Sequence, residues 1–167
     1  MKVEYVAPFV QAASDLLEIA IGDAETGVIG LSGTTFSTAN VNIAMRVDGA
    51  LRGDVVYSMS TLTAQKLARS FTGIDTQLFG REMGKVLARL GNALVAKTEN
   101  LLATQGLECE ISRPVVFQGL NVEFSGIAPA LIVPIETSIG SISVTVAVDD
   151  DQQNRQCNRD TATAKAS

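Results

Sequence analysis

Residues 79–105, FGREMGKVLARLGNALVAKTENLLATQ, form the longest segment of the chain with clean helical periodicity. Its apolar side chains recur at intervals of three, four or seven residues and form one stripe, made of Met83, Leu87, Leu90, Leu94 and Leu101. The opposite side of such a helix carries Lys85, Arg89, Asn92 and Ala96. The pattern predicts an amphipathic helix whose stripe packs on a core and whose outer face carries the chemistry of the chain.

The rest of the chain predicts short strands and two further helices around this segment. Before it, we expect a strand at residues 3–6, a helix from Pro8 to Gly22, a strand at 27–36, a hairpin of 41–47 and 51–59, and a helix from the N-cap Ser60 to Phe71, closed by Gly73. After it, we expect a strand at 107–112, an extended segment at 115–117 following Pro114, and a hairpin of 131–136 and 142–148.

This order of elements predicts one α+β domain. Antiparallel hairpins with long helices packed against them form an antiparallel or mixed sheet of about six strands. The order of elements also suggests two related halves. The first half has a helix, a hairpin and a helix, and the second has a helix, strands and a hairpin. The open edges of such a sheet offer a route to a homodimer. Residues 149–167 have almost nothing to bury, so we expect a domain at residues 1–148 and a disordered polar tail.

Composition excludes several kinds of function. The chain has 167 residues, a net charge of −5 and no basic run, which argues against a nucleic-acid surface. It contains no histidine, which excludes Ser–His and Cys–His nucleophile pairs and His-ligated metals. No apolar run is long enough for a membrane span and the first residues do not form a signal peptide, so we expect a cytoplasmic protein. Cys109 and Cys157 lack metal-ligand spacing and suit a reducing compartment.

Motifs that carry chemistry on their own are scarce in this chain. Gly30 and Gly33 precede neither a Lys nor a helix N-terminus, so they do not form a phosphate-binding loop. The three aspartates at residues 149–151 are typical of a solvated charge run, rather than of a cation site. An exposed Asn in a helix, such as Asn92, is usually plain surface, and it costs roughly 0.5 kcal/mol relative to Ala.

Several short segments, taken together and in order, resemble a known family. They are KVEY..PF...A...LE...G at residues 2–22, GALRGDVVYSMS at 49–60, LGN at 90–92, GLECEISRPVVFQG at 106–119 and LIVPIETSIGSISVTVAV at 131–148. These segments look like the CheX branch of the CheC/CheX/FliY chemotaxis phosphatases. The resemblance covers nearly all of residues 1–148, and it implies a CheC-like fold.

The resemblance also implies an activity. Proteins of this family remove the phosphoryl group from the aspartyl phosphate of the response regulator CheY. One of their helices carries Asp or Ser, three residues, Glu, two residues, then Asn. The Asn side chain orients the attacking water and the Glu pairs with a Lys of the regulator, while the magnesium ion belongs to the regulator. Such catalysis by positioning needs no cofactor, nucleophile or His of the phosphatase itself, which suits this chain.

The motif is incomplete on the long helix. Asn92 matches the Asn of the family, whereas Arg89 stands at the position of its Glu and Lys85 at that of its Ser or Asp. A contact of opposite charges would become two facing cations, and close charge pairs in complexes couple by about 1.5 to 7 kcal/mol. Even the low end of this range, about 1.5 kcal/mol, weakens docking more than tenfold. We therefore expect reduced or altered activity, unless Arg89 swings aside or pairs with an acidic group of a divergent regulator.

The first helix carries the complementary half of the motif. There Ser14 and Glu18 match the family pattern, and Ile21 replaces the Asn. Two alternatives to a phosphatase remain open. In one, Lys85 and Arg89 read the acidic pocket of a receiver domain, or its phosphoryl group, in a non-catalytic module. In the other, the chain has a structural role in a flagellar or sensory assembly and uses its sheet edges.

Overall fold

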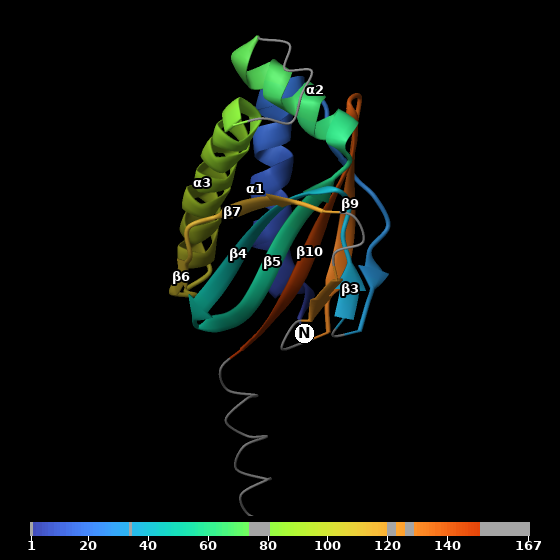
Figure 1. The fold of residues 1–167 in the computed structure, drawn as a ribbon. Helices are drawn as coiled ribbons and strands as arrows, with labels where there is room; N and C mark the ends of the chain where they lie inside the picture. The colour runs from blue at the N-terminus through green and yellow to red at the C-terminus, as the bar shows by residue number, and fades with distance from the viewer. Residues whose placement is uncertain (1, 34, 74–80, 120–122, 126–128, 151–167) are drawn as a thin grey trace, which may run out of the picture.

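Two long helices and a large antiparallel sheet form the body of the protein (Figure 1). The computed structural model describes residues 2–33, 35–73, 81–119, 123–125 and 129–150. α1 (Val3–Ile21) and α3 (Arg81–Thr104) cover one face of the sheet, and α2 (Thr61–Thr72) lies across one end. The predicted α+β class is confirmed. No helix within these described ranges is both long and apolar enough to cross a membrane.

The sheet has eight strands in the order β1-β9-β10-β5-β4-β6, with β2 beside β9 and β7 beside β4. We expected about six, and the difference comes from short edge strands. A separate pair is formed by β3 and β8. The strands are β1 (Glu25–Thr26), β2 (Gly30–Leu31), β3 (Thr35–Ser37), β4 (Val41–Gly49), β5 (Leu51–Met59), β6 (Cys109–Ile111), β7 (Val115–Gln118), β8 (Glu123–Ser125), β9 (Leu131–Thr137) and β10 (Gly140–Asp150).

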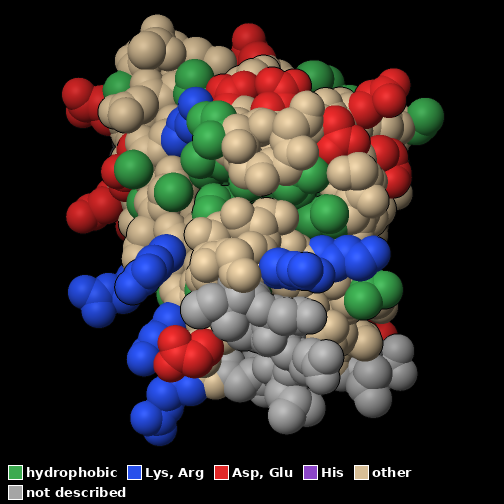
Figure 2. Space-filling model, turned by 90° about the horizontal axis from the view of Figure 1, so that it is seen from above, with side chains coloured by type: hydrophobic (Ala, Val, Ile, Leu, Met, Phe, Trp, Pro, Cys, Tyr) green, Lys and Arg blue, Asp and Glu red, His purple; other side chains and the backbone are tan. Residues whose placement is uncertain are grey.

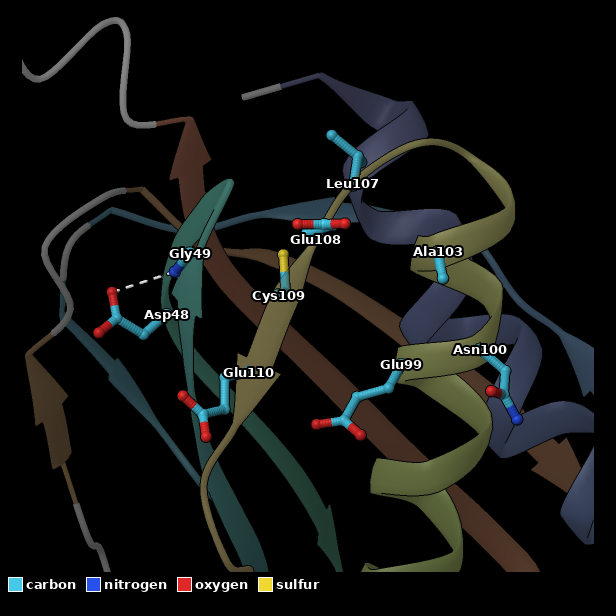
Figure 3. A pocket seen from close by; sticks show the side chains of 9 residues that line it. All are labelled: Asp48, Gly49, Glu99, Asn100, Ala103, Leu107, Glu108, Cys109 and Glu110. Carbon is cyan, nitrogen blue, oxygen red and sulfur yellow. Dashed lines mark hydrogen bonds between the residues drawn. The ribbon is translucent and has the colours of Figure 1, made fainter.

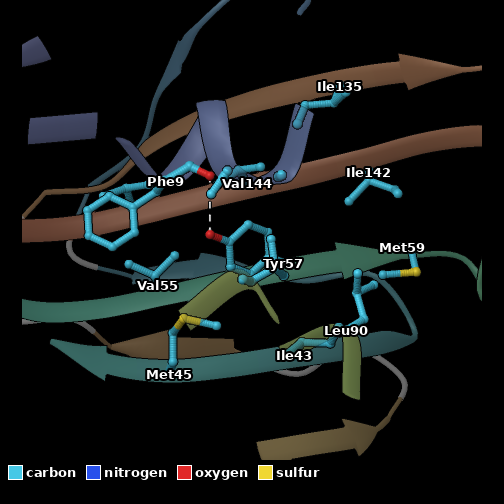
Figure 4. Packing of buried hydrophobic residues seen from close by; sticks show 14 of the residues in the cluster. Phe9, Ile43, Met45, Val55, Tyr57, Met59, Leu90, Ile135, Ile142 and Val144 are labelled. Carbon is cyan, nitrogen blue, oxygen red and sulfur yellow. Dashed lines mark hydrogen bonds between the residues drawn. The ribbon is translucent and has the colours of Figure 1, made fainter. Parts of the chain in front are cut away.

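Both predicted hairpins are confirmed, and they meet at the centre of the sheet. β4 pairs with β5 and β9 with β10, while β5 and β10 lie side by side with Tyr57 opposite Val144. Tyr57 is fully buried, and its hydroxyl donates a hydrogen bond of 3.2 Å to the backbone oxygen of Phe9 in α1 (Figure 4). Burial raises the pKa of the Tyr57 hydroxyl, so it stays protonated and ties the sheet to α1.

The connections repeat between the two halves of the chain. In the first half, α1 precedes the short strands β1 and β2 and the hairpin β4–β5. In the second half, α3 precedes β6 and β7 and the hairpin β9–β10. The short strands of each half pair with the hairpin of the other half, because β1 and β2 join β9 while β6 and β7 join β4. Each half therefore has the order helix, short strands, hairpin, with α2 between the halves, whereas we expected a helix, a hairpin and a helix, then a helix, strands and a hairpin.

The predicted strand at residues 3–6 is wrong, because α1 already begins at Val3. Tyr5 and Val6 are buried together with Phe9, one helical turn later. This spacing places all three on the core side of a helix, and their packing outweighs the unfavourable Pro8 in the second turn. The predicted strand at 27–36 is also too long. It is divided into β2 and β3, and β1 precedes it.

Strand β10 extends two residues beyond its predicted end at residue 148. β10 continues through Asp149 and Asp150, which pair with Arg52 and Leu51 of β5. The hydroxyl of Tyr5 donates a hydrogen bond of 3.0 Å to Oδ2 of Asp150, which ties this end of the strand to α1. Residues 151–167, including Cys157, lie outside the described residues, so their disorder stays a prediction.

The helix ends follow the predicted capping residues. Ser60 Oγ accepts a hydrogen bond of 3.1 Å from the backbone N–H of Thr63 at the start of α2. Gly73 ends α2 in the left-handed conformation, with φ of 69°. The expected start of α3 at residues 79 and 80 lies outside the described residues. In the described part, Met83, Leu87, Leu90 and Leu94 are buried as predicted, whereas Leu101 is half-buried and Leu102 occupies the core.

Candidate functional site

The outer face of α3 carries all three residues that the motif singled out. Lys85, Arg89 and Asn92 are exposed and follow one another at intervals of four and three residues, so they form a row along the helix. We call this row the α3 face. Ala93 and Ala96 are also exposed on this side and add no bulk. The predicted division of α3 into a buried stripe and an open face is confirmed.

The members of the α3 face differ in the contacts that they make within the chain. Lys85 Nζ lies 3.4 Å from Glu82 Oε1, but both side chains are more than half exposed, and such pairs contribute little. Arg89 and Asn92 make no hydrogen bond or ion pair with any of the residues that the structure describes. A guanidinium group and an amide therefore project from the middle of a rigid helix, and both can form hydrogen bonds outward.

Gly91 fixes the position of Asn92, and the motif comparison did not assign it a role. Gly91 is buried, and a Cβ atom on it would lie 2.7 Å from the Cβ of Pro114 and 3.1 Å from Cγ2 of Ile43. α3 therefore contacts β4 and the segment between β6 and β7 through bare backbone at this turn. The glycine itself could have indicated this close contact in the sequence. Gly inside a helix is unfavourable by about 1 kcal/mol relative to Ala, so its presence there usually has a packing reason.

The partial motif on α1 lies in a different setting. Ser14 is half-buried, Glu18 is exposed, and Ile21 is the last residue of the helix and packs against the core. Gly22 then ends α1 in the left-handed conformation, with φ of 94°. Ile21 stands where the family motif has Asn, and this position is therefore apolar, partly covered and at the end of a helix. The structure does not present Ser14, Glu18 and Ile21 as a second open face.

α1 ends beside an acidic hollow. Its lining contains four carboxylates, which belong to Glu18, Asp23, Glu25 and Glu136. The strand pairing places Glu25 directly opposite Glu136, where like charges repel. Ser138 Oγ donates a hydrogen bond of 3.0 Å to Oδ1 of Asp23. The hollow is therefore strongly negative, and it lies at the negative end of the α1 dipole.

A second acidic hollow, of about 720 Å³, lies between the C-terminal half of α3 and strands β4 and β6 (Figure 3). Its centre is Cys109, whose Sγ accepts a hydrogen bond of 3.4 Å from the N–H of Leu51. Burial raises the pKa of this thiol and outweighs the hydrogen bonds from the backbone of Leu51 and Ala50, which lower it, so the thiol is not an activated nucleophile. Over the described ranges, no group of His, Cys, Asp or Glu side chains could hold a metal ion.

Comparison with solved structures shows which fold this is, although no family model and no curated protein sequence matches the chain. A chemotaxis protein CheX from Desulfovibrio desulfuricans superposes with a TM-score of 0.78 at 18% identity, over 87% of this chain and 99% of that chain. A CheC-like superfamily protein from Shewanella sp. PV-4 gives a TM-score of 0.79 at 17% identity, over 89% and 99%.

A third similar structure contains a partner protein. It is the CheX–CheY–BeF3–Mg2+ complex from Borrelia burgdorferi, of which one chain matches with a TM-score of 0.72 at 23% identity, over 89% of this chain and 100% of that chain. The identities are low, so the likeness concerns the fold. The protein has the fold of the CheX and CheC-like chemotaxis proteins.

Proposed function

We propose that the chain docks its α3 face on a phosphorylated CheY-type receiver domain and shortens the lifetime of the aspartyl phosphate, with activity that is reduced or altered by Arg89. The observation that carries this proposal is the exposed Asn92 in the middle of α3, on a CheX-like fold. The Borrelia complex adds support, because it joins a CheX protein to CheY with BeF3, which stands in for the phosphoryl group. The Mg2+ ion would belong to the receiver, and the chain itself would work in the cytoplasm without a cofactor.

Asn92 is the proposed catalytic residue. Its amide offers one acceptor oxygen and two N–H donors, so it can hold a water molecule and orient it toward phosphorus. The water oxygen then forms a new bond to phosphorus, and the bond from phosphorus to the aspartyl oxygen breaks. The products are a free carboxylate on the receiver and inorganic phosphate. This chemistry needs no covalent intermediate on the phosphatase, which agrees with a chain that contains no histidine.

Arg89 and Lys85 decide which receiver can dock. Both side chains are exposed cations beside Asn92. A receiver that places a cation opposite Arg89 is repelled, whereas one that places a carboxylate there gains a charge-assisted contact. We infer that the reaction is slow on receivers that suit a complete family motif, and that the cognate receiver carries an acidic group at this position.

A binding module without catalysis is the second candidate. It is favoured by Arg89, which makes no ion pair with the described residues and can bind phosphoryl oxygens directly. The lifetime of the aspartyl phosphate separates the two functions. A phosphatase shortens it, while a module binds the phosphorylated receiver and leaves its lifetime unchanged.

The test uses receiver domains of CheY type encoded in the same genome, phosphorylated and mixed with the purified chain. We expect faster phosphate loss with the native chain and loss of about 10²-fold of that acceleration in Asn92→Ala, because a displaced water is costly in positioning catalysis. Asn100→Ala is the matched control, since Asn100 is exposed on the same helix two turns later. Equal rates with Asn92→Ala and native chain would exclude the catalytic role.

A homodimer remains part of the proposal. The edge segment next to β9 exposes three apolar side chains, since Val28 is 89% exposed, Ile29 49% and Leu31 79%. An edge strand of this kind offers unpaired backbone groups and apolar surface to a second copy. Sedimentation of the native chain and of Leu31→Lys measures whether this edge is used. A native chain that sediments as a monomer would contradict it.

A further inference from the structure

α2 presents a row of exposed side chains on the side that faces away from the domain. Leu62, Lys66 and Arg69 follow one another at intervals of four and three residues, and we call them the α2 face. Leu62 is 60% exposed. The opposite side of the helix packs Thr63, Ala64, Leu67 and Ala68 onto the body of the protein. The α2 face therefore has no structural role in the packing of α2.

α2 lies at the same end of the molecule as the beginning of α3 (Figure 1). α2 and residues 81–92 of α3 contain five basic side chains and only one acidic side chain, a local formal charge of +4 in a chain with a net charge of −5. Viewed from above, most Lys and Arg side chains lie in the lower half of the view and most Asp and Glu side chains in the upper half, with one acidic side chain among the basic ones (Figure 2). The basic residues are Lys66, Arg69, Arg81, Lys85 and Arg89.

This basic surface is not neutralised by the part of the chain that the structure describes. Among its five cations, only Lys85 takes part in an ion pair with a described residue, and Glu82 in that pair is the single carboxylate of the surface. Repulsion among clustered like charges lowers the stability of the folded chain. A surface of this sign on an acidic protein therefore indicates an anionic partner.

We propose that the receiver domain bound by the α3 face extends over α2, where it presents carboxylates to Lys66 and Arg69 and an apolar contact to Leu62. This inference rests on the function proposed above, and it names a second contact of the same partner. Three features support it: α2 packs against α3, the cations of the α2 face are opposite in charge to a phosphorylated partner, and the face combines an exposed apolar side chain with flanking cations, as interfaces do.

The two faces would act on different steps. Asn92 acts on the reacting water, so its loss lowers the rate at saturating receiver concentration. Lys66 and Arg69 lie on another helix and act on the encounter, so their loss lowers the association rate and raises the concentration needed for half-maximal rate. This difference separates the present inference from the proposed function, because each has its own kinetic readout.

The experiment measures binding of a CheY-type receiver domain from the same genome, loaded with BeF3− and Mg2+, by stopped-flow fluorescence at low and high ionic strength. The test variant is Lys66→Glu/Arg69→Glu. The control is Arg46→Glu/Arg52→Glu, which makes the same change of charge on exposed residues of the β4–β5 hairpin, away from α2. We expect association about tenfold slower in the test variant at low ionic strength, convergence at high ionic strength, and less than about a twofold change in the control.

Leu62→Ser tests the apolar contact separately. It should speed dissociation several-fold at both ionic strengths, because burial of an apolar side chain is insensitive to salt. Circular dichroism checks that each variant is folded, and Lys66→Gln/Arg69→Gln replaces the charge reversal if that variant does not fold.

Several results would overturn the inference. If the native chain binds the receiver and the test variant binds equally well, the α2 contact is wrong and the proposed function stands. If the native chain binds no receiver, both fail. Tighter binding to phosphatidylglycerol vesicles or to duplex DNA, lost in the same variant, would assign the surface to a membrane or nucleic acid. Self-association lost in that variant would assign it to the acidic hollow of a second copy.

Discussion

α1 and α3 are built alike and carry opposite halves of one motif. Each is amphipathic, each packs on the same face of the sheet, and Lys97 Nζ of α3 lies 3.2 Å from Asp15 Oδ2 of α1. α1 has the carboxylate, Glu18, without the amide, while α3 has the amide, Asn92, without the carboxylate. The setting of the Asn position separates the two helices. Asn92 is exposed in the middle of α3, whereas the equivalent Ile21 is the last residue of α1 and is partly covered.

The two helices also differ in the charges at their neighbouring ends. Glu18, near Glu25 and Glu136, lies at the C-terminal end of α1, whereas Arg81 and Lys85 lie in the first turns of α3. Glu18, Arg81 and Lys85 oppose the helix dipole, which favours cations at a C-terminus and anions at an N-terminus by about 0.3 to 1 kcal/mol each, whereas Glu82 in the first turn of α3 complements it. The dipole therefore does not account for Glu18, Arg81 and Lys85. Their distribution suits an end of the molecule that meets a charged partner.

Completing the motif on α3 has the largest expected effect. Arg89→Glu combined with Lys85→Ser should raise binding to BeF3-loaded CheY from Borrelia burgdorferi, and phosphate loss from its phosphorylated form, more than tenfold, because one close charge pair changes from repulsive to attractive. Arg46→Ser/Arg52→Glu, on the β4–β5 hairpin, makes the same change of net charge and is the control. An unchanged rate would show that Arg89 does not limit the reaction.

Changing the glycines of α3 has the next largest effect and tests how the helix holds Asn92. Gly91→Ala should lower the free energy of unfolding by about 1 to 2 kcal/mol, because the methyl group collides with Pro114 and Ile43 and this outweighs the gain in helix propensity. Gly84→Ala is the matched control. A Cβ there meets nothing within 4 Å, so we expect stabilisation of up to about 1 kcal/mol.

Urea unfolding followed by circular dichroism measures both glycine variants. The same samples are then assayed for phosphate loss, which should fall in Gly91→Ala and stay unchanged in Gly84→Ala, since only the first glycine sets the backbone next to Asn92. Equal stability of the two variants would mean that the contact with Pro114 yields without strain.

Local periodicity made most of the fold predictable, and contacts between distant segments explain the rest. The stripe of α3, both hairpins and the caps of α2 follow from residues within one element. The helical state of residues 3–6 does not, because it depends on Tyr5 and Val6 packing into a core built by other segments. The short strands β1 and β2 likewise form only because β9 is beside them.

The same distinction holds for the candidate site. A period of 3.6 residues was enough to place Lys85, Arg89 and Asn92 on one exposed face. The basic surface was not predictable, because the sequence has no basic run, and α2, which carries Lys66 and Arg69, packs against α3 only in the folded chain. The structural reason for Gly91, a close contact with Pro114, also joins segments that are far apart in the chain.

The ion pair between α1 and α3 should contribute little. Its side chains are about one third exposed, with Lys97 at 34% and Asp15 at 33%. A double-mutant cycle of Asp15→Asn and Lys97→Gln, measured by urea unfolding, should give a coupling energy below about 1 kcal/mol that decreases with added salt. A larger, salt-independent value would mean that the pair holds the two helices in register and is screened from water.

The smallest expected effect is the most informative about the two helices. Ile21→Asn completes Ser14, Glu18 and Asn on α1 in sequence, yet we expect no gain in phosphate loss, because position 21 packs against the core and the helix ends there. The assay is best done in an Asn92→Ala background, where any new activity must come from α1, with Ile19→Asn as the control at a position that is 79% exposed. Activity with Ile21→Asn would show that motif spacing alone is sufficient. Its absence would show that the Asn of the motif must also stand at an exposed, mid-helix position, as Asn92 does on α3.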